Sequence, residues 1–265
     1  MSDHHLCSDL SEPTIDRRHA LLAPVMAAFS VYAFVREARA MDGPSDRRLS
    51  ARRWIDRQEA LARGLRSGSV SPRAWHDEVN RLARDLDLDQ FMAELKTSRS
   101  APAGAPFMRD PVKRDIGFVD EQGQPRRLTY AAATFSFGPE NVITPHAHKH
   151  MASAHMVIEG RVRIRTFDRI ADQDGALLIR PTGDQVRGVG EAAAMTTPVD
   201  NVHWFTPASP RATTFDVIVS DLDPGQKSYE IQPVDPLGGE PQADGTILAP
   251  IMSFEAAMQR YSAHI

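Results

Sequence analysis

Apolar residues in the segment 41–100 recur at the spacing of an α-helix. Four of them fall at positions i, i+4, i+7 and i+11 and form one stripe, namely Trp75, Val79, Leu82 and Leu86. Such a stripe is the buried face of an amphipathic helix. Ser71 and Pro72 precede it, a pair typical of a helix start with Ser as N-cap and Pro in the first turn. The pattern predicts a helical segment over residues 41–100 that packs against the rest of the chain.

After residue 100 the pattern changes to that of strands. Ser98–Pro106, rich in Ser, Ala, Gly and Pro, is typical of a linker. Short runs of strand-forming residues then alternate with Gly, Pro and Asp turns: Ile116–Val119, Leu128–Phe137, His155–Ile158, Val162–Phe167, Ala176–Ile179, Val202–Phe205, Thr213–Val219 and Tyr229–Val234. This spacing favours a sandwich or barrel, including the jelly roll. We predict a mainly β fold, with a barrel over residues 101–250 and a C-terminal helix within residues 251–265.

The first forty residues have the layout of a bacterial twin-arginine export signal. The pair Arg17-Arg18 precedes an apolar run from Ala20 to Val35, and Ala38-Arg39-Ala40 offers a small-x-small cleavage site. The apolar run is short for a stable membrane span. We therefore predict that residues 1–40 are an export signal, that the protein is periplasmic and that it has no stable membrane span. The alternative is a retained helix in a cytoplasmic protein.

Composition argues against a nucleic-acid partner and restricts the residue types that could bind a metal. The 265 residues are 42% hydrophobic and 25% charged, as in an ordinary globular protein. The net charge is -4 and aromatic residues make up 7%, so the basic stripe and the stacking platform of a nucleic-acid-binding protein are both missing from the sequence. Cys7 is the one cysteine, which excludes an internal disulfide and a cysteine-based zinc site. Among ten histidines, four lie between residues 146 and 155, so imidazole is the predicted metal ligand.

His146, His148 and His203 are the predicted metal ligands. In a strand, residues i and i+2 point to the same face, so His146 and His148 present two imidazoles one pleat apart. His203 lies on a distant predicted strand, which we expect a sheet-on-sheet fold to bring close. The alternative is that these histidines are only exposed or hydrogen-bonded. We expect His155 to be a hydrogen-bonded core residue and His150 to lie in a loop.

The histidines stand in two motifs that resemble the cupin family. The first motif comprises Ile143–Met151 and Val157–Asp168, and the second comprises Asp200–Pro207 and Phe215–Ile218. Within that family the chain looks most like the three-histidine thiol dioxygenases of the cysteamine dioxygenase and plant cysteine oxidase type, over roughly residues 125–235. The resemblance implies a double-stranded β-helix, or jelly roll, and a homodimer. It implies Fe(II) as the cofactor, with Ni, Cu, Mn or Zn as alternatives, because imidazole suits several of these metals.

Two departures from the family's pattern bear on the site. Many cupins supply a glutamate ligand four or five residues after the second histidine, where this chain has Ala152 and Ser153. The resemblance therefore implies a three-histidine centre with open positions. Thiol dioxygenases often place a tyrosine a few residues beyond the aspartate that matches Asp216, but that stretch has none here, and Tyr229 is the nearest. Asp216 and Tyr229 are thus the candidate catalytic residues.

Arg180 and Trp204 are the candidate substrate-binding residues. Arg180 follows an apolar run, and an inward arginine can clamp a carboxylate with two hydrogen bonds. The alternative is an outward, solvated side chain. Trp204 adjoins His203 and lines either the pocket or the core.

The leading functional hypothesis is a non-haem iron(II) dioxygenase that oxidises a small thiol to its sulfinate. Its partners are then a small-molecule substrate and dioxygen. One alternative is a cupin oxygenase or isomerase that acts on a non-thiol small molecule at the same ligands. Another is a jelly roll that binds a metal or ligand without catalysis.

Overall fold

A computed structural model describes residues 48–223, 225 and 229–264. The predicted export signal at residues 1–40 lies outside this range, so its cleavage and the periplasmic location stay predictions. Among the described helices, none is long and apolar enough to cross a membrane.

Three helices open the described chain: α3 (Ala51–Ser67), α4 (Pro72–Asp85) and α5 (Leu88–Thr97). The hydroxyl of Ser71 accepts a hydrogen bond from the backbone N–H of Ala74, so the predicted N-cap of α4 is confirmed. Helix α3 is capped at its C-terminus by Gly68, which has a φ of 75° that favours glycine. A fourth helix, α6 (Phe254–Tyr261), follows the strands and continues into a short 3-10 turn.

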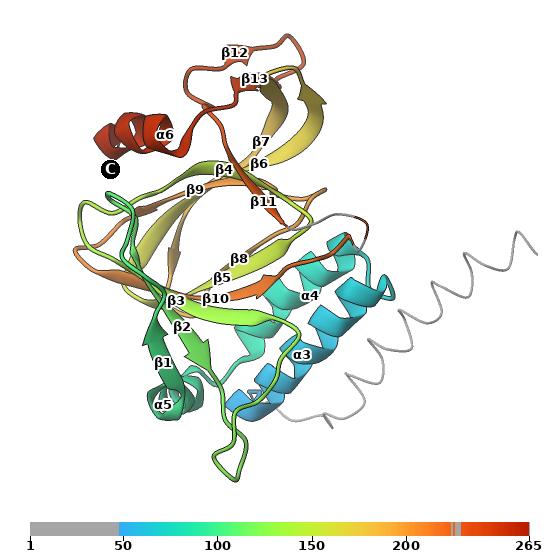
Figure 1. The fold of residues 1–265 in the computed structure, drawn as a ribbon, viewed down its shortest axis with the longest axis vertical. Coiled ribbons are helices and arrows are strands. Elements are labelled where there is room, and N and C mark those ends of the chain that lie inside the picture. The colour runs from blue at the N-terminus through green and yellow to red at the C-terminus, as the bar shows by residue number, and fades with distance from the viewer. Residues whose placement is uncertain (1–47, 224, 226–228, 265) are drawn as a thin grey trace, which may run out of the picture. The chain divides into compact units, whose positions relative to one another are not determined.

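The strands form two antiparallel sheets (Figure 1). The six-stranded sheet consists, in spatial order, of β1 (Arg99–Pro102), β2 (Val112–Gly117), β3 (Ala131–Phe137), β10 (Ala212–Val219), β5 (Ala152–Glu159) and β8 (Ala192–Met195). The seven-stranded sheet consists of β11 (Glu230–Pro233), β4 (Ile143–Lys149), β9 (Val202–Pro207), β6 (Arg161–Gln173), β7 (Ala176–Gly188), β13 (Ile247–Pro250) and β12 (Glu240–Pro241).

The pairing of the central strands is that of a jelly roll. Strand β3 pairs with β10, β4 with β9, β5 with β8 and β6 with β7, so the first strand of the series pairs with the last and each inner pair nests within the outer one. Successive pairs alternate between the two sheets. The predicted fold class, a mainly β jelly roll preceded by a small helical segment, is confirmed.

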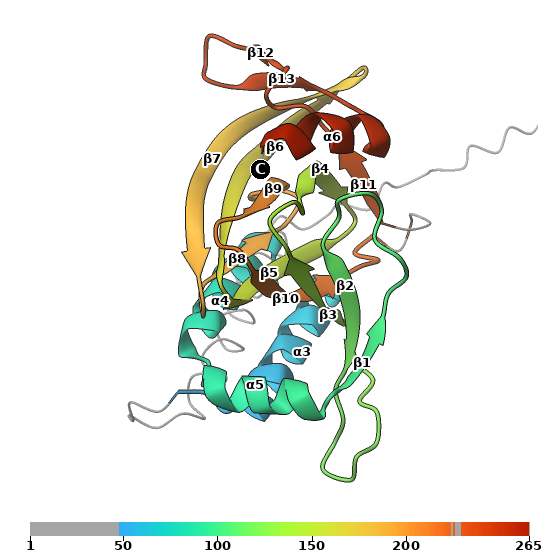
Figure 2. The same ribbon diagram turned by 90° about the vertical axis from the view of Figure 1, so that its left-hand side faces the viewer.

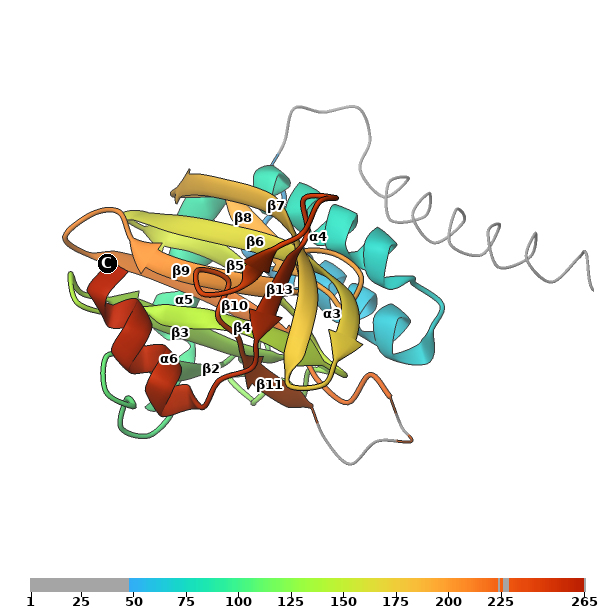
Figure 3. The same ribbon diagram turned by 90° about the horizontal axis from the view of Figure 1, so that it is seen from above.

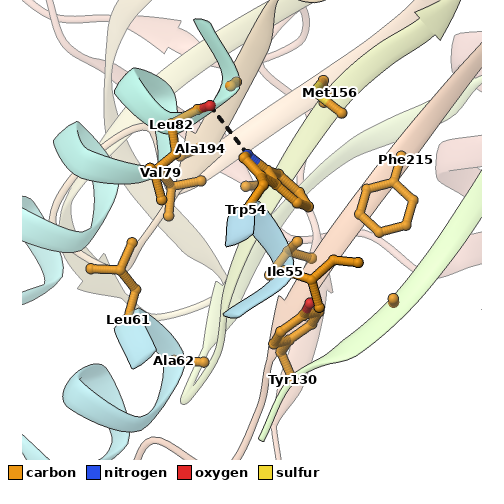
Figure 4. Close-up of a cluster of buried hydrophobic side chains, with 14 of the residues drawn as sticks. Trp54, Ile55, Leu61, Ala62, Val79, Leu82, Tyr130, Met156, Ala194 and Phe215 are labelled. Carbon is orange, nitrogen blue, oxygen red and sulfur yellow. Dashed lines mark hydrogen bonds between the residues drawn. The ribbon is translucent and has the colours of Figure 1, made fainter. Parts of the chain in front are cut away.

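The six-stranded sheet is covered by helices on one face and faces the other sheet with its second face. Strand β10 alternates between the two: Phe215 packs among the helices, and Asp216 points to the interior between the sheets. Figure 4 shows the helical side, where Trp54 of α3 lies beside Phe215 and donates a hydrogen bond from its ring nitrogen to the carbonyl of Leu82, at 3.2 Å. The helical segment thus supplies the outer half of the core, as its apolar stripes predict.

One segment differs from the sequence prediction. Within the predicted linker Ser98–Pro106, residues Arg99–Pro102 form the edge strand β1, which pairs with β2. An edge strand bonds to one neighbour only and tolerates proline on its free side, so its composition does not distinguish it from a linker. The prediction of a linker is therefore wrong for Arg99–Pro102. The second half, Ala103–Pro106, leads into a wall of the cavity described below.

Candidate metal centre

Three histidines from two neighbouring strands meet inside the jelly roll. His146 and His148 lie on β4, and His203 on β9 is the direct cross-strand partner of His146. The ring centroids are 4.2 Å apart for His146 and His203, 4.7 Å for His148 and His203, and 4.9 Å for His146 and His148. One ligand atom from each ring lies within 4.8 Å of the others. The rings meet because β4 and β9 pair within one sheet, whereas the sequence argument expected packing between two sheets.

Backbone carbonyls determine which ring nitrogens face the centre. His146 Nδ1 lies 2.8 Å from the carbonyl oxygen of Thr144, and His203 Nδ1 lies 3.2 Å from that of Asn201. Each carbonyl accepts the Nδ1 proton, which leaves the Nε2 lone pair of both rings free for a metal. Asn201 also donates from Nδ2 to the carbonyl of His148, at 2.9 Å, so one buried amide residue ties both strands together.

Burial keeps the three rings neutral. Desolvation lowers the pKa of His146 to about 4. The hydrogen bond with the Thr144 carbonyl partly offsets this effect, and the nearby ring of His155 adds to it. Burial, followed by repulsion from the neighbouring imidazoles, lowers the pKa of His148 and of His203 well below its ordinary value. Neutral imidazole is the form that binds metal, so the centre is ready to bind at neutral pH without first losing protons.

The donor set fits a metal ion. With the His146 proton on Nδ1, its Nε2 lone pair faces the Nε2 of His148 at 3.0 Å. The Nδ1 of His148 is buried and has no hydrogen-bond partner among the described residues. An ion held by the three Nε2 atoms would accept both facing lone pairs. Imidazole suits iron, copper, nickel and zinc, so the ligands do not choose between these metals.

A second polar group lies on the opposite sheet, close to the histidine cluster. His155 Nδ1 lies 2.7 Å from the Asp216 carboxylate, and His155 Nε2 lies 2.9 Å from the hydroxyl of Ser153. All three side chains are buried. The carboxylate accepts the Nδ1 proton, and Nε2 is hydrogen-bonded to the Ser153 hydroxyl. Both nitrogens of His155 are therefore occupied, which makes it a hydrogen-bonded core residue, as expected, and not a fourth ligand.

A cavity of about 350 Å³ opens onto both polar groups. Its polar and charged lining comprises Thr144, Ser153, His155, Asp216, Asp110, Lys113 and the three clustered histidines. Its apolar lining comprises Ala103, Gly104, Ala105, Pro106, Phe107, Pro111, Phe135, Ile143, Met151, Ile218, Ile231, Phe254 and Met258. The loop between β1 and β2 forms one wall and rises toward α6, which forms another (Figure 2). The histidines therefore line a chamber whose other walls are largely apolar.

Of the other predicted site residues, Asp216 lines this cavity, and Arg180, Trp204 and Tyr229 do not. The Arg180 side chain is 50% exposed and pairs with Asp244 at 3.4 Å, because it follows the buried Ile179 on a strand and so points outward. Tyr229 is also half-exposed. A substrate in the cavity would therefore meet neither the Arg180 guanidinium nor the Tyr229 hydroxyl.

Trp204 is buried on the face of β9 opposite to His203. Its ring lies against Tyr261 of α6, at 4.8 Å between centroids, and under the Arg165 guanidinium, whose central carbon is 3.9 Å from the ring centroid. Figure 3 shows α6 beside the strands β4 and β9. Since neighbouring residues of a strand point to opposite faces, the position next to His203 belongs to the core under α6 and not to the cavity.

Sequence reasoning missed the apolar walls. Phe107 directly follows the predicted linker Ser98–Pro106, and nothing in the local sequence pattern marks it as a residue of a cavity wall. Phe254 and Met258 are different, because they stand four residues apart in the predicted C-terminal helix and so share a face. That spacing could have indicated that one face of α6 packs against the interior of the protein. His150 directly follows β4 and has a φ of 57°, so it lies outside the strand, as predicted.

No family model and no curated protein matches the sequence. Solved structures match at low similarity. An oxalate oxidase structure is 17% identical over 45% of this chain and 56% of its own, with a TM-score of 0.32. An 11S globulin from Wrightia tinctoria is 13% identical over 51% of this chain and 30% of its own, with a TM-score of 0.35.

A third structure is an uncharacterized conserved protein with a double-stranded beta-helix domain from Klebsiella pneumoniae. It is 14% identical over 48% of this chain and 88% of its own, with a TM-score of 0.31. This chain spans little more than half of the oxalate oxidase chain. Likeness at this level assigns neither a family nor an activity.

Proposed function

We propose that this protein is a metal-dependent dioxygenase in which His146, His148 and His203 hold Fe(II) and a thiol occupies the cavity. The observation that carries the proposal is a set of three neutral imidazoles, two of them buried and that of His146 half-buried, which line one cavity. The ligand group contains no carboxylate among the described residues. Three protein ligands leave positions free for substrate and dioxygen, which is the arrangement that oxygenases need.

The chain's own residues would bind, orient and shield. The Thr144 and Asn201 carbonyls hold the ligand rings in orientation. The apolar walls exclude water from the reacting groups. The hydrogen-bonded chain Ser153–His155–Asp216 fixes the polar wall that faces the histidines. When bound, iron supplies the redox chemistry. In the overall reaction, one thiol and one dioxygen molecule give one sulfinic acid, with both oxygen atoms on sulfur.

Oxygen uptake tests the proposal. The protein is loaded with Fe(II) under anaerobic conditions and mixed with a panel of thiols, with phenolic compounds as a contrast set. We expect uptake with at least one thiol, formation of its sulfinate, and no turnover by metal-free protein. Uptake with a phenolic compound alone would replace the thiol by a non-thiol substrate. Full metal occupancy without any uptake would favour the non-catalytic alternative.

A matched pair of variants separates the metal ligands from other histidines. His203→Ala removes a ligand and should abolish both metal retention and uptake. His150→Asn changes a histidine two residues beyond His148 that is not in the cluster, and asparagine tolerates its positive φ. We expect His150→Asn to keep metal and activity. The homodimer implied by the resemblance stays a prediction.

A further inference from the structure

We infer that the substrate carries a bulky apolar body, aromatic or branched aliphatic and free of carboxylate, with its reactive group at the histidine end of the cavity. That the ligand is a substrate rests on the proposed function. Which ligand the cavity binds can be tested without turnover. It replaces the expectation of a small thiol with a larger, apolar one.

The size of the cavity is the first argument. A volume of about 350 Å³ equals the share of about a dozen liquid water molecules, at roughly 30 Å³ each. A thiol with four or five non-hydrogen atoms would fill only part of that space and leave apolar wall in contact with water. A body of about ten non-hydrogen atoms, such as a substituted ring, would fill about twice as much of it, and chambers of this size are typical of small-molecule sites.

The distribution of charge is the second argument. Charged residues of the lining, apart from the histidines, are Asp110, Lys113 and Asp216, and no arginine is among them. The Lys113 ammonium lies 3.1 Å from Asp115, and Asp216 is bonded to His155. The one lysine of the lining is paired with Asp115, so a carboxylate on the body of a ligand would have to compete for that ammonium and would otherwise meet apolar wall and two acids. Burying an unpaired charge in such a place is strongly unfavourable.

The mouth of the cavity is the third argument. Phe107 of the β1–β2 loop is 48% exposed and Phe254 at the start of α6 is 52% exposed, yet both rings line the cavity. Large apolar side chains that are half-exposed at the rim of a chamber are typical of a ligand-binding groove. An apolar body between the two rings would remove their exposed surface from water, which is favourable in proportion to the area buried.

The inner walls continue the same surface. Phe135 of β3 and Ile218 of β10 line the cavity from the six-stranded sheet, and Ile231 of β11 lines it from the other. Ser153, His155 and Asp216 join the histidine cluster, because the His155 ring lies 5.5 Å from that of His203. The other charged lining residues are Asp110 and Lys113. A ligand with one reactive polar end and an apolar body matches this division.

Binding to metal-loaded protein without oxygen tests the inference separately from turnover. Co(II) replaces Fe(II), and two thiols with the same reactive group, benzyl mercaptan and 2-mercaptoethanol, are titrated while the cobalt absorption is followed. We expect benzyl mercaptan to bind at least about tenfold more tightly, because its ring removes apolar wall and rim from water. A third probe, 4-(mercaptomethyl)benzoate, adds a carboxylate to the same ring and should lose most of that gain.

Variants at the rim locate the effect. Phe107→Ala and Phe254→Ala should each weaken benzyl mercaptan several-fold and leave 2-mercaptoethanol unchanged. Phe254→Leu should recover most of the loss. Val189→Ala is the matched control, because Val189 is an equally exposed apolar residue outside the cavity lining. Both rim residues are half-exposed, so the variants should keep the wild-type melting temperature.

The outcomes separate the two proposals. Equal affinity for the two thiols, or rim variants that behave like Val189→Ala, would overturn the inference whatever the enzyme oxidises. Tight, rim-dependent binding of the aromatic thiol would sustain it even if no thiol were oxidised, and in that case only the proposed reaction would fail.

Discussion

The interior between the two sheets has a filled half and an open half, and the same strands contribute to both. In the filled half, apolar side chains from both sheets close the space: Phe137, Val157, Val162, Ile164, Ala193, Met195, Phe205 and Ala212. In the open half, the histidine cluster and the Ser153–His155–Asp216 chain border the cavity. On β9 the change occurs between Phe205 and His203, two residues apart on one face.

This contrast teaches that the polar part of the site lies on the same inward strand faces as the core, while the β1–β2 loop and α6 add apolar walls. Val157, His155 and Ser153 succeed one another along the inward face of β5, so one strand passes from core to site without changing its conformation. The Phe205 ring of the filled half packs against the His155 ring of the open half, with centroids 4.7 Å apart. The filled half thereby holds the side chains of the open half in position.

The largest expected effect on stability comes from breaking the filled half. Phe205 is fully buried, so Phe205→Ala should cost about 3–5 kcal/mol in the free energy of unfolding, measured by urea denaturation. Phe205→Leu should cost less, about 1.5 kcal/mol or under, and keeps the test usable if the alanine variant does not fold. A near-neutral Phe205→Ala would mean that this half is not a packed core.

Metal binding should have the next largest effect on stability, and it should act through the histidines of the open half alone. At a metal concentration of one hundred times Kd, the folded state should gain about 2.7 kcal/mol. The melting temperature should rise on addition of Co(II) to the wild type and fall back with a chelator. His203→Ala should show neither change, and His150→Asn should show both. An equal rise in His203→Ala would place the metal elsewhere.

Breaking the polar chain of the open half should cost somewhat less. Asp216→Ala leaves the buried Nδ1–H of His155 without its acceptor, which should cost about 1–3 kcal/mol. Asp216→Asn keeps an acceptor oxygen and should cost less. Urea denaturation of both variants compares them, and a larger loss for asparagine than for alanine would contradict this account of the hydrogen bond.

The smallest expected effect lies outside both halves, at His76 on α4. Burial lowers the pKa of His76, but hydrogen bonds to Asp200 and Asp77 outweigh it, so the pKa is raised above its ordinary value. A raised folded pKa stabilises the protein below the unfolded pKa of about 6.5, and the gain is lost as pH rises through the folded value. His76→Gln should therefore destabilise the protein at about pH 5.5, by less than about 1 kcal/mol, and hardly at about pH 8.5. Unfolding curves at both pH values check the sign.

Local patterns were enough to predict the helices and a mainly β fold. The stripe from Trp75 to Leu82, the Ser71 cap and the strand-forming runs separated by turns are all local features, and each reappears in the structure. His146 and His148 were predictable as a pair because their spacing alone places them on one face of a strand.

The remaining parts of the site depend on contacts between distant segments. The pairing of His155 with Asp216 follows from the register of β5 against β10, which sets these two residues directly opposite each other. No local pattern encodes that register. The apolar walls also join segments far apart in sequence, with Phe107 from an irregular loop and Phe254 from the last helix. For Arg180 the sequence left both faces open, since its place after an apolar run does not say which face of the strand it occupies.

The central claim is that His146, His148 and His203 hold one metal ion at the end of the cavity. The most direct test is metal content after anaerobic reconstitution with Fe(II) and removal of excess ion, measured by elemental analysis on wild type, the three histidine-to-alanine variants and His150→Asn. The account predicts one ion per chain in the wild type and in His150→Asn, and none or nearly none in each alanine variant. A wild type that retains no metal, or an alanine variant that retains it fully, would contradict the claim.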